Sequence, residues 1–341
     1  MKFFSFFQKI DFWVLFPLVF LSFLGLLTIY SIGFSKNNLL NFKKQIVFFL
    51  IGFSLMIVLS FFDWEIFKKK SLLFLFFYFL SLALIFYLLI FGSKIRGAKI
   101  WYRFGPFSFD PSEILKISLI FIFASFFSKK HIELYDLKSI FFSLLFLILP
   151  GLFLSMQPNL GAFLVLIFIW FSILLVSGIR QREFLILIFL GLLFLIFLWS
   201  KILLPYQKER IIGFLFPQLS DPLKINWSQR QAKIAIGSAG FWGKGIFEGE
   251  QKKLGFLTDP ETDFIFSVLV EETGFLGAFL TFNLFLILIF RILKISFSQR
   301  SNFTKLFGVG IASQIFIYFF LNLSTNIGLL PVVGIPLPFL S

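Results

Sequence analysis

Long apolar segments recur along this chain of 341 residues, and they constrain its fold more than any other feature. Most are about 17–25 residues long, the length that an α-helix needs to cross a hydrocarbon core of about 30 Å. Hydrophobic residues make up 59% of the sequence and charged residues 14%, against about 25% charged residues in soluble domains. The sequence therefore predicts an all-α polytopic membrane protein that forms one transmembrane domain over residues 1–341.

About nine apolar spans are expected, separated by polar loops. We place them at residues 12–32, 44–62, 71–91, 114–128, 139–155 and 162–177, with a seventh ending near 204, an eighth at 263–290 and a ninth ending near 323. One loop, Pro205–Thr262, is much longer than the others and lies between spans seven and eight. We expect this large loop to be extracytoplasmic and to carry the polar chemistry of the protein.

Composition excludes several classes of site. The chain has no cysteine and one histidine, so disulfides, thiolate metal sites and His-rich metal clusters are ruled out. Its net charge of +14 suits anionic lipid headgroups or a phosphorylated substrate. A role with nucleic acid would need a soluble basic domain, and the sequence contains none.

The short basic loops favour a cytoplasmic N-terminus, because Lys and Arg concentrate on the inner side of membrane proteins. Positive charge also lies in a loop that would then face outward, at Lys94, Arg96, Lys99 and Arg103. An excess of cations on the outer side indicates that an anion binds there.

The segment Asp110–Glu113, at the start of the fourth span, has two interpretations. Asp, Pro and Glu at these spacings are sufficient to cap and start a helix. Capping does not explain Lys116, which lies one turn further into an apolar helix and on the same face as Glu113. Because an ion pair inside a membrane span is costly, it often marks a site. Glu113 and Lys116 are therefore either a structural pair or substrate contacts.

The large loop contains further candidates for binding an anion. The glycines of IGSAGFWGKG, residues 236–245, would let backbone N–H groups approach a phosphate beside Lys244. Their spacing is not that of a P-loop, which argues against a nucleotide site. Arg210 lies in a short amphipathic stretch, and Gln231 opens the segment that contains the glycines.

Asp263 lies where the large loop meets the eighth span. One interpretation is a helix cap, since a negative charge stabilises a helix N-terminus; the other is a reactive carboxylate at the edge of the bilayer. Glu271 and Glu272 follow about 12 Å deeper in the same span. Carboxylates at that depth must be paired or protonated, so we expect basic or polar partners for them and a structural role. Asp263 is the leading candidate for the working residue.

Five motifs in order resemble those of the SEDS family of bacterial peptidoglycan polymerases, in its RodA branch. They are DPSEILK, QPNLG, QAKIAIGSAGFWGKG, ETDFIFSVLVEETGFLG and GLLPVVGIPLPFLS, and they extend over essentially the whole chain. EGEQ after GKG, together with PVVG, is closer to RodA than to its division homologue FtsW. The chain departs from the family pattern at Asp110, Asn159 and Ala239, where the family has Gln, Asp and Gly. The family has ten helices, so we expect the last helix to be missing here.

The resemblance implies that the chain polymerises lipid II, an undecaprenyl-pyrophosphate disaccharide-peptide, into glycan strands for cell-wall elongation and rod shape. The essential Asp of the family corresponds to Asp263. The donor sugar is α-linked and the product is β-1,4, so we expect one inverting displacement with Asp263 as general base. The expected substrate contacts are Glu113, Lys116, Arg96, Arg210, Gln231 and Lys244.

The resemblance also implies surroundings and partners. The charge of the leaving pyrophosphate must be neutralised by Lys or Arg, or by a divalent cation such as Mg²⁺ or Mn²⁺. The expected location is the bacterial inner membrane, in contact with membrane lipids and with a class B penicillin-binding transpeptidase.

Two alternatives stay open. A flippase or transporter for a lipid-linked precursor would suit a polar pair within a bundle, although no inverted repeat is evident. A non-catalytic scaffold for a transpeptidase would need none of the polar residues inside the spans.

Overall fold

The structure, a computed structural model, describes residues 11–61, 71–93, 98–105, 107–129, 137–216 and 227–341. Within these ranges, nine helices are long and apolar enough to cross a membrane, which confirms the expected number. Helices are the expected form for these segments, because an apolar span must satisfy its backbone polar groups internally.

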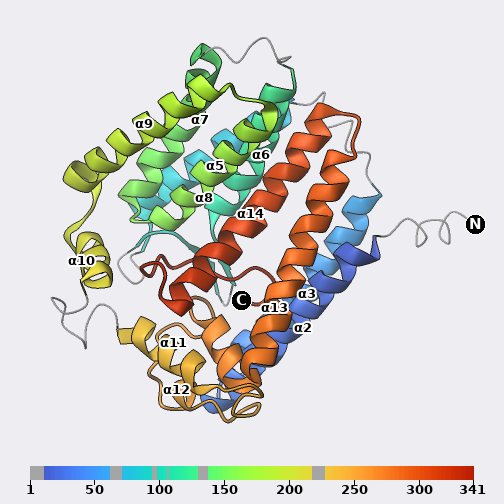
Figure 1. Ribbon diagram of the computed structural model, residues 1–341, viewed down its shortest axis with the longest axis vertical. Helices are drawn as coiled ribbons and strands as arrows, with labels where there is room; N and C mark the ends of the chain where they lie inside the picture. The colour runs from blue at the N-terminus through green and yellow to red at the C-terminus, as the bar shows by residue number, and fades with distance from the viewer. Residues whose placement is uncertain (1–10, 62–70, 94–97, 106, 130–136, 217–226) are drawn as a thin grey trace, which may run out of the picture. The chain divides into compact units, whose positions relative to one another are not determined.

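The crossing helices keep the order read from the sequence (Figure 1). Before the large loop they are α2 (Phe12–Ser35), α3 (Leu40–Ser60), α5 (Ser71–Phe91), α6 (Pro111–Ser128), α7 (Leu137–Met156), α8 (Leu160–Ser177) and α9 (Gln181–Phe197), which the π-helical turn η2 (Leu198–Ile202) extends. After it come α13 (Ile265–Phe297) and α14 (Asn302–Ile327).

Two loops contain secondary structure that the sequence analysis did not predict. The large loop folds into α10 (Pro205–Leu215), α11 (Trp227–Ser238) and the single turn α12 (Glu250–Lys253). The loop after α5 contains a short antiparallel hairpin of β1 (Tyr102–Phe104) and β2 (Phe107–Phe109), with Tyr102 opposite Phe109. Gly105, at a φ of 60°, lies between the two strands.

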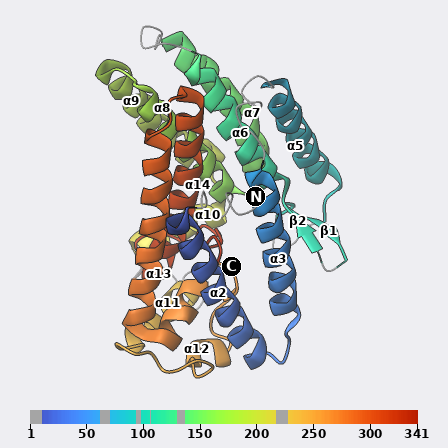
Figure 2. The ribbon, with the colours of Figure 1, turned by 90° about the vertical axis from the view of Figure 1, so that its right-hand side faces the viewer.

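The chain divides into two compact units. The first unit comprises Met1–Phe62, Leu204–Ile292 and Ile315–Ser341, and the second Asp63–Leu203 and Leu293–Gln314. In the second unit, α6 packs against α5 and α8, and Phe121 of α6 stacks on Phe74 of α5. In the first unit, α2 and α3 run side by side, as Figures 1 and 2 both show, and α12 packs against α2 and α11.

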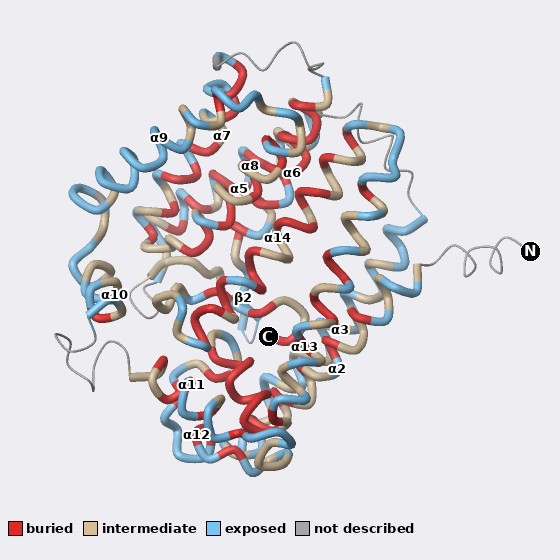
Figure 3. The backbone as a smooth tube through the Cα atoms, viewed as in Figure 1, coloured by how far each residue is buried: buried red, intermediate tan, exposed pale blue. Residues whose placement is uncertain are grey.

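Burial differs sharply between the crossing helices (Figure 3). Most side chains of α6 are buried, whereas those of α3 and α9 are mostly exposed and apolar, as lipid-facing helices require. In the first unit a small core brings together α2, α11, the start of α13 and the C-terminal segment after α14. Its members are Ile32, Ala232, Leu257, Phe264 and Val268, with Val332 packed against them. Because Phe264 is one of them, this core fixes the residue that directly follows Asp263.

Candidate active site

Asp263 belongs to a tight turn in front of α13 rather than to the helix itself. The backbone N–H groups of Thr262, Asp263 and Phe264 all donate to the carbonyl of Asp259, at 3.2, 3.1 and 3.4 Å. The helix begins at Ile265, two residues later than the sequence predicted. The interpretation of Asp263 as the first residue of the span was therefore wrong.

The carboxylate of Asp263 is half-buried against the C-terminal segment. A Cβ atom placed on Gly334 would lie 3.7 Å from Oδ2 of Asp263, so the backbone of Gly334 faces this carboxylate directly. Gly334 has a φ of 75°, a conformation that favours glycine. The PVVGIPLPF segment thus passes over Asp263 at the one residue without a side chain.

Two predicted substrate contacts lie in the same unit as Asp263. Arg210, on α10, donates from Nη1 to the carbonyl of Val332 at 3.3 Å, two residues before Gly334. Gln231 is buried on α11, next to Ala232 of the small core that also holds Phe264. Both side chains are therefore attached to segments that border Asp263.

The glycine-rich loop is joined to α13 by an exchange of backbone hydrogen bonds. The N–H groups of Lys244 and Gly245 donate to the carbonyls of Glu271 and Glu272, at 2.9 and 3.1 Å. In return, Phe275 and Leu276 donate to carbonyls of the loop, at 3.0 and 3.3 Å. The N–H groups of Lys244 and Gly245 are engaged with α13, so these two are not available to a phosphate.

Two glycines make this exchange possible. Gly274 interrupts α13 with a φ of 72° and a ψ of −163°, which frees carbonyls of the preceding turn. A Cβ atom on Gly243 would lie 2.2 Å from the carbonyl oxygen of Glu272, and one on Gly274 would lie 2.3 Å from the nitrogen of Gly243. The two backbones approach too closely for any side chain.

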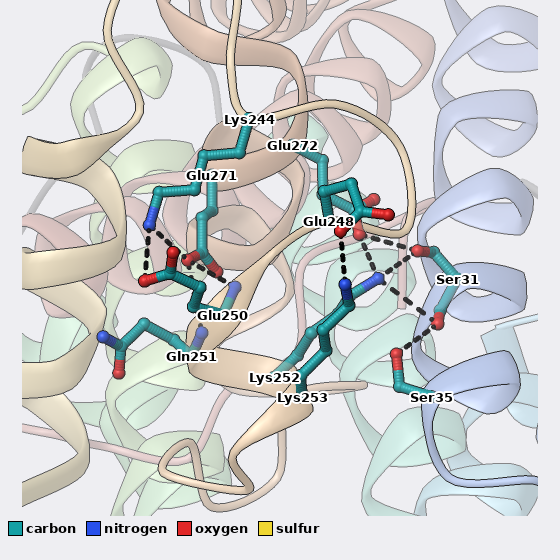
Figure 4. A network of polar contacts seen from close by, with 10 residues as sticks. All are labelled: Ser31, Ser35, Lys244, Glu248, Glu250, Gln251, Lys252, Lys253, Glu271 and Glu272. Atoms are coloured by element: carbon teal, nitrogen blue, oxygen red, sulfur yellow. Dashed lines mark hydrogen bonds and ion pairs between the residues drawn. The ribbon is translucent and has the colours of Figure 1, made fainter.

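Glu271 and Glu272 each have the basic and polar partners expected for them (Figure 4). Oε1 of Glu271, a fully buried side chain, accepts from Nζ of Lys244 at 3.3 Å and from the backbone N–H groups of Glu250 and Gln251 at 2.9 and 3.2 Å. It thereby caps the N-terminus of α12 from another element. Partial burial alone would lower the pKa of Lys244. The hydrogen bonds to Glu250 and Glu271 outweigh this effect, so the pKa of Lys244 is raised. Lys244 is therefore held in the loop as part of a structural ion pair.

Glu272 forms a second, separate pair on the other side of the loop (Figure 4). Its Oε1 accepts from Nζ of Lys252 and from Oγ of Ser31, the latter at 2.6 Å. The side chains of Lys252 and Glu272 are 1% and 4% exposed. This pair anchors α12 both to α13 and to α2, and the expected structural role of the two glutamates is consistent with these contacts.

Glu113 and Lys116 form an ion pair in the second unit, with 2.7 Å between Nζ and Oε1. Lys116 is 2% exposed but Glu113 is 51% exposed, so the buried member is the cation. Asp110 caps α6 by accepting from the N–H of Ser112 at 2.8 Å, as predicted. Burial raises the pKa of Asp110, and the charge of Lys116 offsets this only in part.

Replacement of Lys116 by methionine should lower activity more than stability. Methionine keeps the buried aliphatic volume, and Glu113, being half-exposed, stays hydrated without its partner. Turnover of lipid II, the substrate that the resemblance implies, and thermal unfolding, measured on the same preparation, test this. Full activity of Lys116→Met would mean that the pair is purely structural.

Arg96, the remaining predicted contact, lies outside the described residues. The described part of the chain gathers no group of three or more His, Cys, Asp or Glu side chains that could hold a metal ion. Sequence reasoning missed Asn322 and Asn326, which donate to the carbonyl of Asp263. The only signal was two amides four residues apart in a predominantly apolar span.

Fold and site define a polytopic membrane protein with a half-buried carboxylate at the end of one long helix, beside a large folded loop. The chain belongs to the cell cycle protein family of FtsW, RodA and SpoVE, which it matches over residues 8–341. It is 36% identical over 251 residues to the peptidoglycan glycosyltransferase MrdB of Escherichia coli K12, covering 74% of this chain and 67% of that protein. It is 35% identical over 303 residues to the probable peptidoglycan glycosyltransferase FtsW of Trichlorobacter lovleyi, covering 88% and 77%.

Solved structures of similar proteins share this fold. One is a chain from a structure on the coordination of polymerization and crosslinking by a peptidoglycan synthase complex, with a TM-score of 0.80, 26% identity and coverage of 98% of this chain and 92% of that one. Another is the crystal structure of the rod shape determining protein RodA of Thermus thermophilus, with a TM-score of 0.70, 24% identity and coverage of 98% and 90%. The all-helical fold expected from the sequence is thereby confirmed.

Proposed function

We propose that this chain is a peptidoglycan glycosyltransferase that polymerises lipid II into glycan strands during cell-wall elongation. The observation that carries the proposal is the carboxylate of Asp263, held outside α13 and against the backbone of Gly334. The names of the relatives MrdB and FtsW as peptidoglycan glycosyltransferases support the same reaction class. Their identities to this chain are nearly equal, so the elongation role rests on the EGEQ and PVVG motifs.

The chemistry is one inverting displacement. The 4-hydroxyl oxygen of the acceptor sugar attacks the anomeric carbon of the donor, and the bond from that carbon to the pyrophosphate oxygen breaks. The hydroxyl proton passes to the carboxylate of Asp263, which acts as general base. Attack from the face opposite the leaving group converts the α-linkage into the β-1,4 product.

Pyrophosphate leaves as an anion and needs no proton, but its charge must be stabilised. We assign this role to Arg210, which lies in the same unit as Asp263. Glu113 and Lys116 stay predicted substrate contacts. Lys244 is the weakest of the proposed contacts, because its ammonium group already bonds to Glu250 and Glu271. A divalent cation carried by the pyrophosphate is the other source of positive charge.

Polymerisation by the purified protein tests the proposal. The complete chain in proteoliposomes should convert fluorescent lipid II into products that form a ladder on a gel and that muramidase degrades. A flippase would move the label across the bilayer without forming polymer, and a scaffold would do neither. Absence of polymer from a folded protein, supplied with its transpeptidase, would contradict the proposed function.

We propose a class B transpeptidase as partner, with its single membrane helix against α13. The exposed face of α13 carries Phe275, Phe279 and Phe290, next to the break at Gly274. Such an exposed apolar face suits another membrane helix. The similarity to a chain from a peptidoglycan synthase complex supports a partner of this kind.

The proposed orientation places the N-terminus in the cytoplasm and the large loop outside the inner membrane, where flipped lipid II is presented. Cysteines in the loops before and after α13 test it, since the chain has none of its own. Leu254→Cys, in the exposed loop, should react with a membrane-impermeant maleimide in intact spheroplasts, and Gln299→Cys should react only after lysis. Labelling in the reverse order would place Asp263 on the cytoplasmic side and overturn the proposal.

The structure guides the choice of these labelling positions. Lys99 and Lys252 also lie in segments expected outside, but both ammonium groups are engaged. Nζ of Lys99 donates to the carbonyls at the end of α5, at 2.8 and 3.2 Å, and Lys252 is buried. Lys99 is thereby a C-terminal helix cap, an arrangement that the charge excess of its loop did not predict.

A further inference from the structure

The first turn of α13 lacks the pattern of an ordinary helix. In a helix the N–H of Ser267 would donate to the carbonyl of Asp263, four residues earlier. Here it donates to Oδ1 of Asn326 at 3.1 Å, while Nδ2 of Asn326 donates to the carbonyl of Asp263 at 2.8 Å. The carboxamide of Asn326 therefore bonds to both groups, the N–H of Ser267 and the carbonyl of Asp263. It is inserted between them and replaces the helical hydrogen bond that they would otherwise form.

The contacts of Asn326 also fix the orientation of its amide. Oδ1 accepts a second hydrogen bond from Oγ of Ser267 at 2.5 Å, and a backbone N–H can face only the oxygen. Nδ2 faces three acceptors, the carbonyls of Asp263 and Asn322 and Oδ1 of Asn322. Asn326 is fully buried, so water does not compete for these groups.

Asn322 links the carbonyl of Asp263 to the C-terminal segment. Its Nδ2 donates to the carbonyl of Asp263 at 3.2 Å and to that of Ile335 at 2.8 Å. Ile335 directly follows Gly334, whose backbone faces the carboxylate of Asp263. The two asparagines, one turn apart on α14, thus fix Asp263 and the segment that covers it relative to each other.

We propose that Asn326 is a positioning residue for Asp263, with Asn322 supporting it. The inserted carboxamide keeps Asp263 outside α13, and without it the Asp263 carbonyl would bond to Ser267 and draw the residue into the helix. The carboxylate would then rotate away from Gly334. This inference rests on the proposed role of Asp263 as general base.

The test compares three alanine variants of the complete chain in proteoliposomes with labelled lipid II. Asn326→Ala should lower kcat about 100-fold with KM unchanged, because a base displaced by about 1 Å loses that much. Ser267→Ala removes one hydroxyl donor from the carboxamide and should lower kcat about five-fold, the effect of one hydrogen bond. Gln229→Ala is the matched control, since this buried amide also bonds to the end of α14 and the segment after it, at the carbonyls of Thr325 and Leu330, without contacting Asp263 in the described structure.

The control separates positioning from folding. Gln229→Ala should lower the melting temperature much as Asn326→Ala does, yet retain kcat. Equal losses of kcat in the two variants would show a merely structural effect and overturn the inference. If Asn326→Ala does not fold, Ser267→Ala decides, and a wild-type kcat in that variant overturns the inference.

Asp263→Asn distinguishes this inference from the proposed function. An active Asp263→Asn protein would remove the general base and with it the whole proposal. An inactive Asp263→Asn protein together with wild-type kcat in Asn326→Ala and Ser267→Ala would overturn only the positioning role.

Discussion

Asp263→Asn should abolish glycan polymerisation while the protein stays folded and inserted. Asparagine has the same shape and preserves the backbone contacts of the turn, namely the N–H to Asp259 and the carbonyl to Asn322 and Asn326. What it loses is the ability to accept the proton of the acceptor hydroxyl. General-base catalysis contributes about 10²–10⁴-fold, so polymer should fall below detection in a gel assay.

Glu248→Gln provides the matched control for removal of one negative charge. Glu248 lies in the same loop, pairs with Lys253 at the surface and touches no proposed substrate contact among the contacts described above. Its variant should polymerise lipid II at the wild-type rate. Near-normal polymer from a well-expressed Asp263→Asn protein would contradict the assignment of the base.

The sequence predicts the membrane helices well, because their signal is local. Apolar length alone places nine spans, and α5 has the predicted ends, Ser71 and Phe91. The cap of α6 by Asp110 is local as well, and it was predicted from four consecutive residues. Where the residues that determine a structural feature lie in the same short segment as the feature, the sequence is sufficient to predict it.

The start of α13 shows where local reasoning fails. Thr262 and Asp263 resemble a helix N-terminus, but they lie in the turn that bonds to the carbonyl of Asp259, and the helix begins only at Ile265. The delay is explained by Asn326, which is 63 residues away in the sequence and inserts its carboxamide into the first turn. A contact over that separation leaves no periodic signal in either segment, and the two amides of α14 do not by themselves indicate their partner.

The glycine-rich loop gives a similar lesson. Its glycines were interpreted as leaving N–H groups available to a phosphate. The structure uses Gly243 for close approach to Gly274, whose own break in α13 provides the carbonyls. Gly243 and Gly274 are thus both needed for one contact, in which the backbone of the loop packs directly against the backbone of α13. Their pairing could be read only after the loop was folded onto the helix.

Glu272→Ala should destabilise the protein by about 3–5 kcal/mol, the usual effect of removing one member of a buried ion pair. The variant leaves the ammonium group of Lys252 buried beside Ser31, without a countercharge at Glu272. Thermal unfolding in detergent, followed by size-exclusion chromatography of the heated protein, measures the loss. The exposed pair of Glu248 and Lys253 is the control, and Glu248→Gln should cause no measurable change.

A double variant identifies the cause of that loss. Glu272→Leu combined with Lys252→Met removes both charges and keeps apolar volume, and buried pairs replaced in this way often lose little stability. The double variant should therefore be more stable than Glu272→Ala, although it has lost one more native side chain. A double variant no more stable than Glu272→Ala would mean that the hydrogen bonds to Ser31, and not the uncompensated charge, hold α12 to α2 and α13.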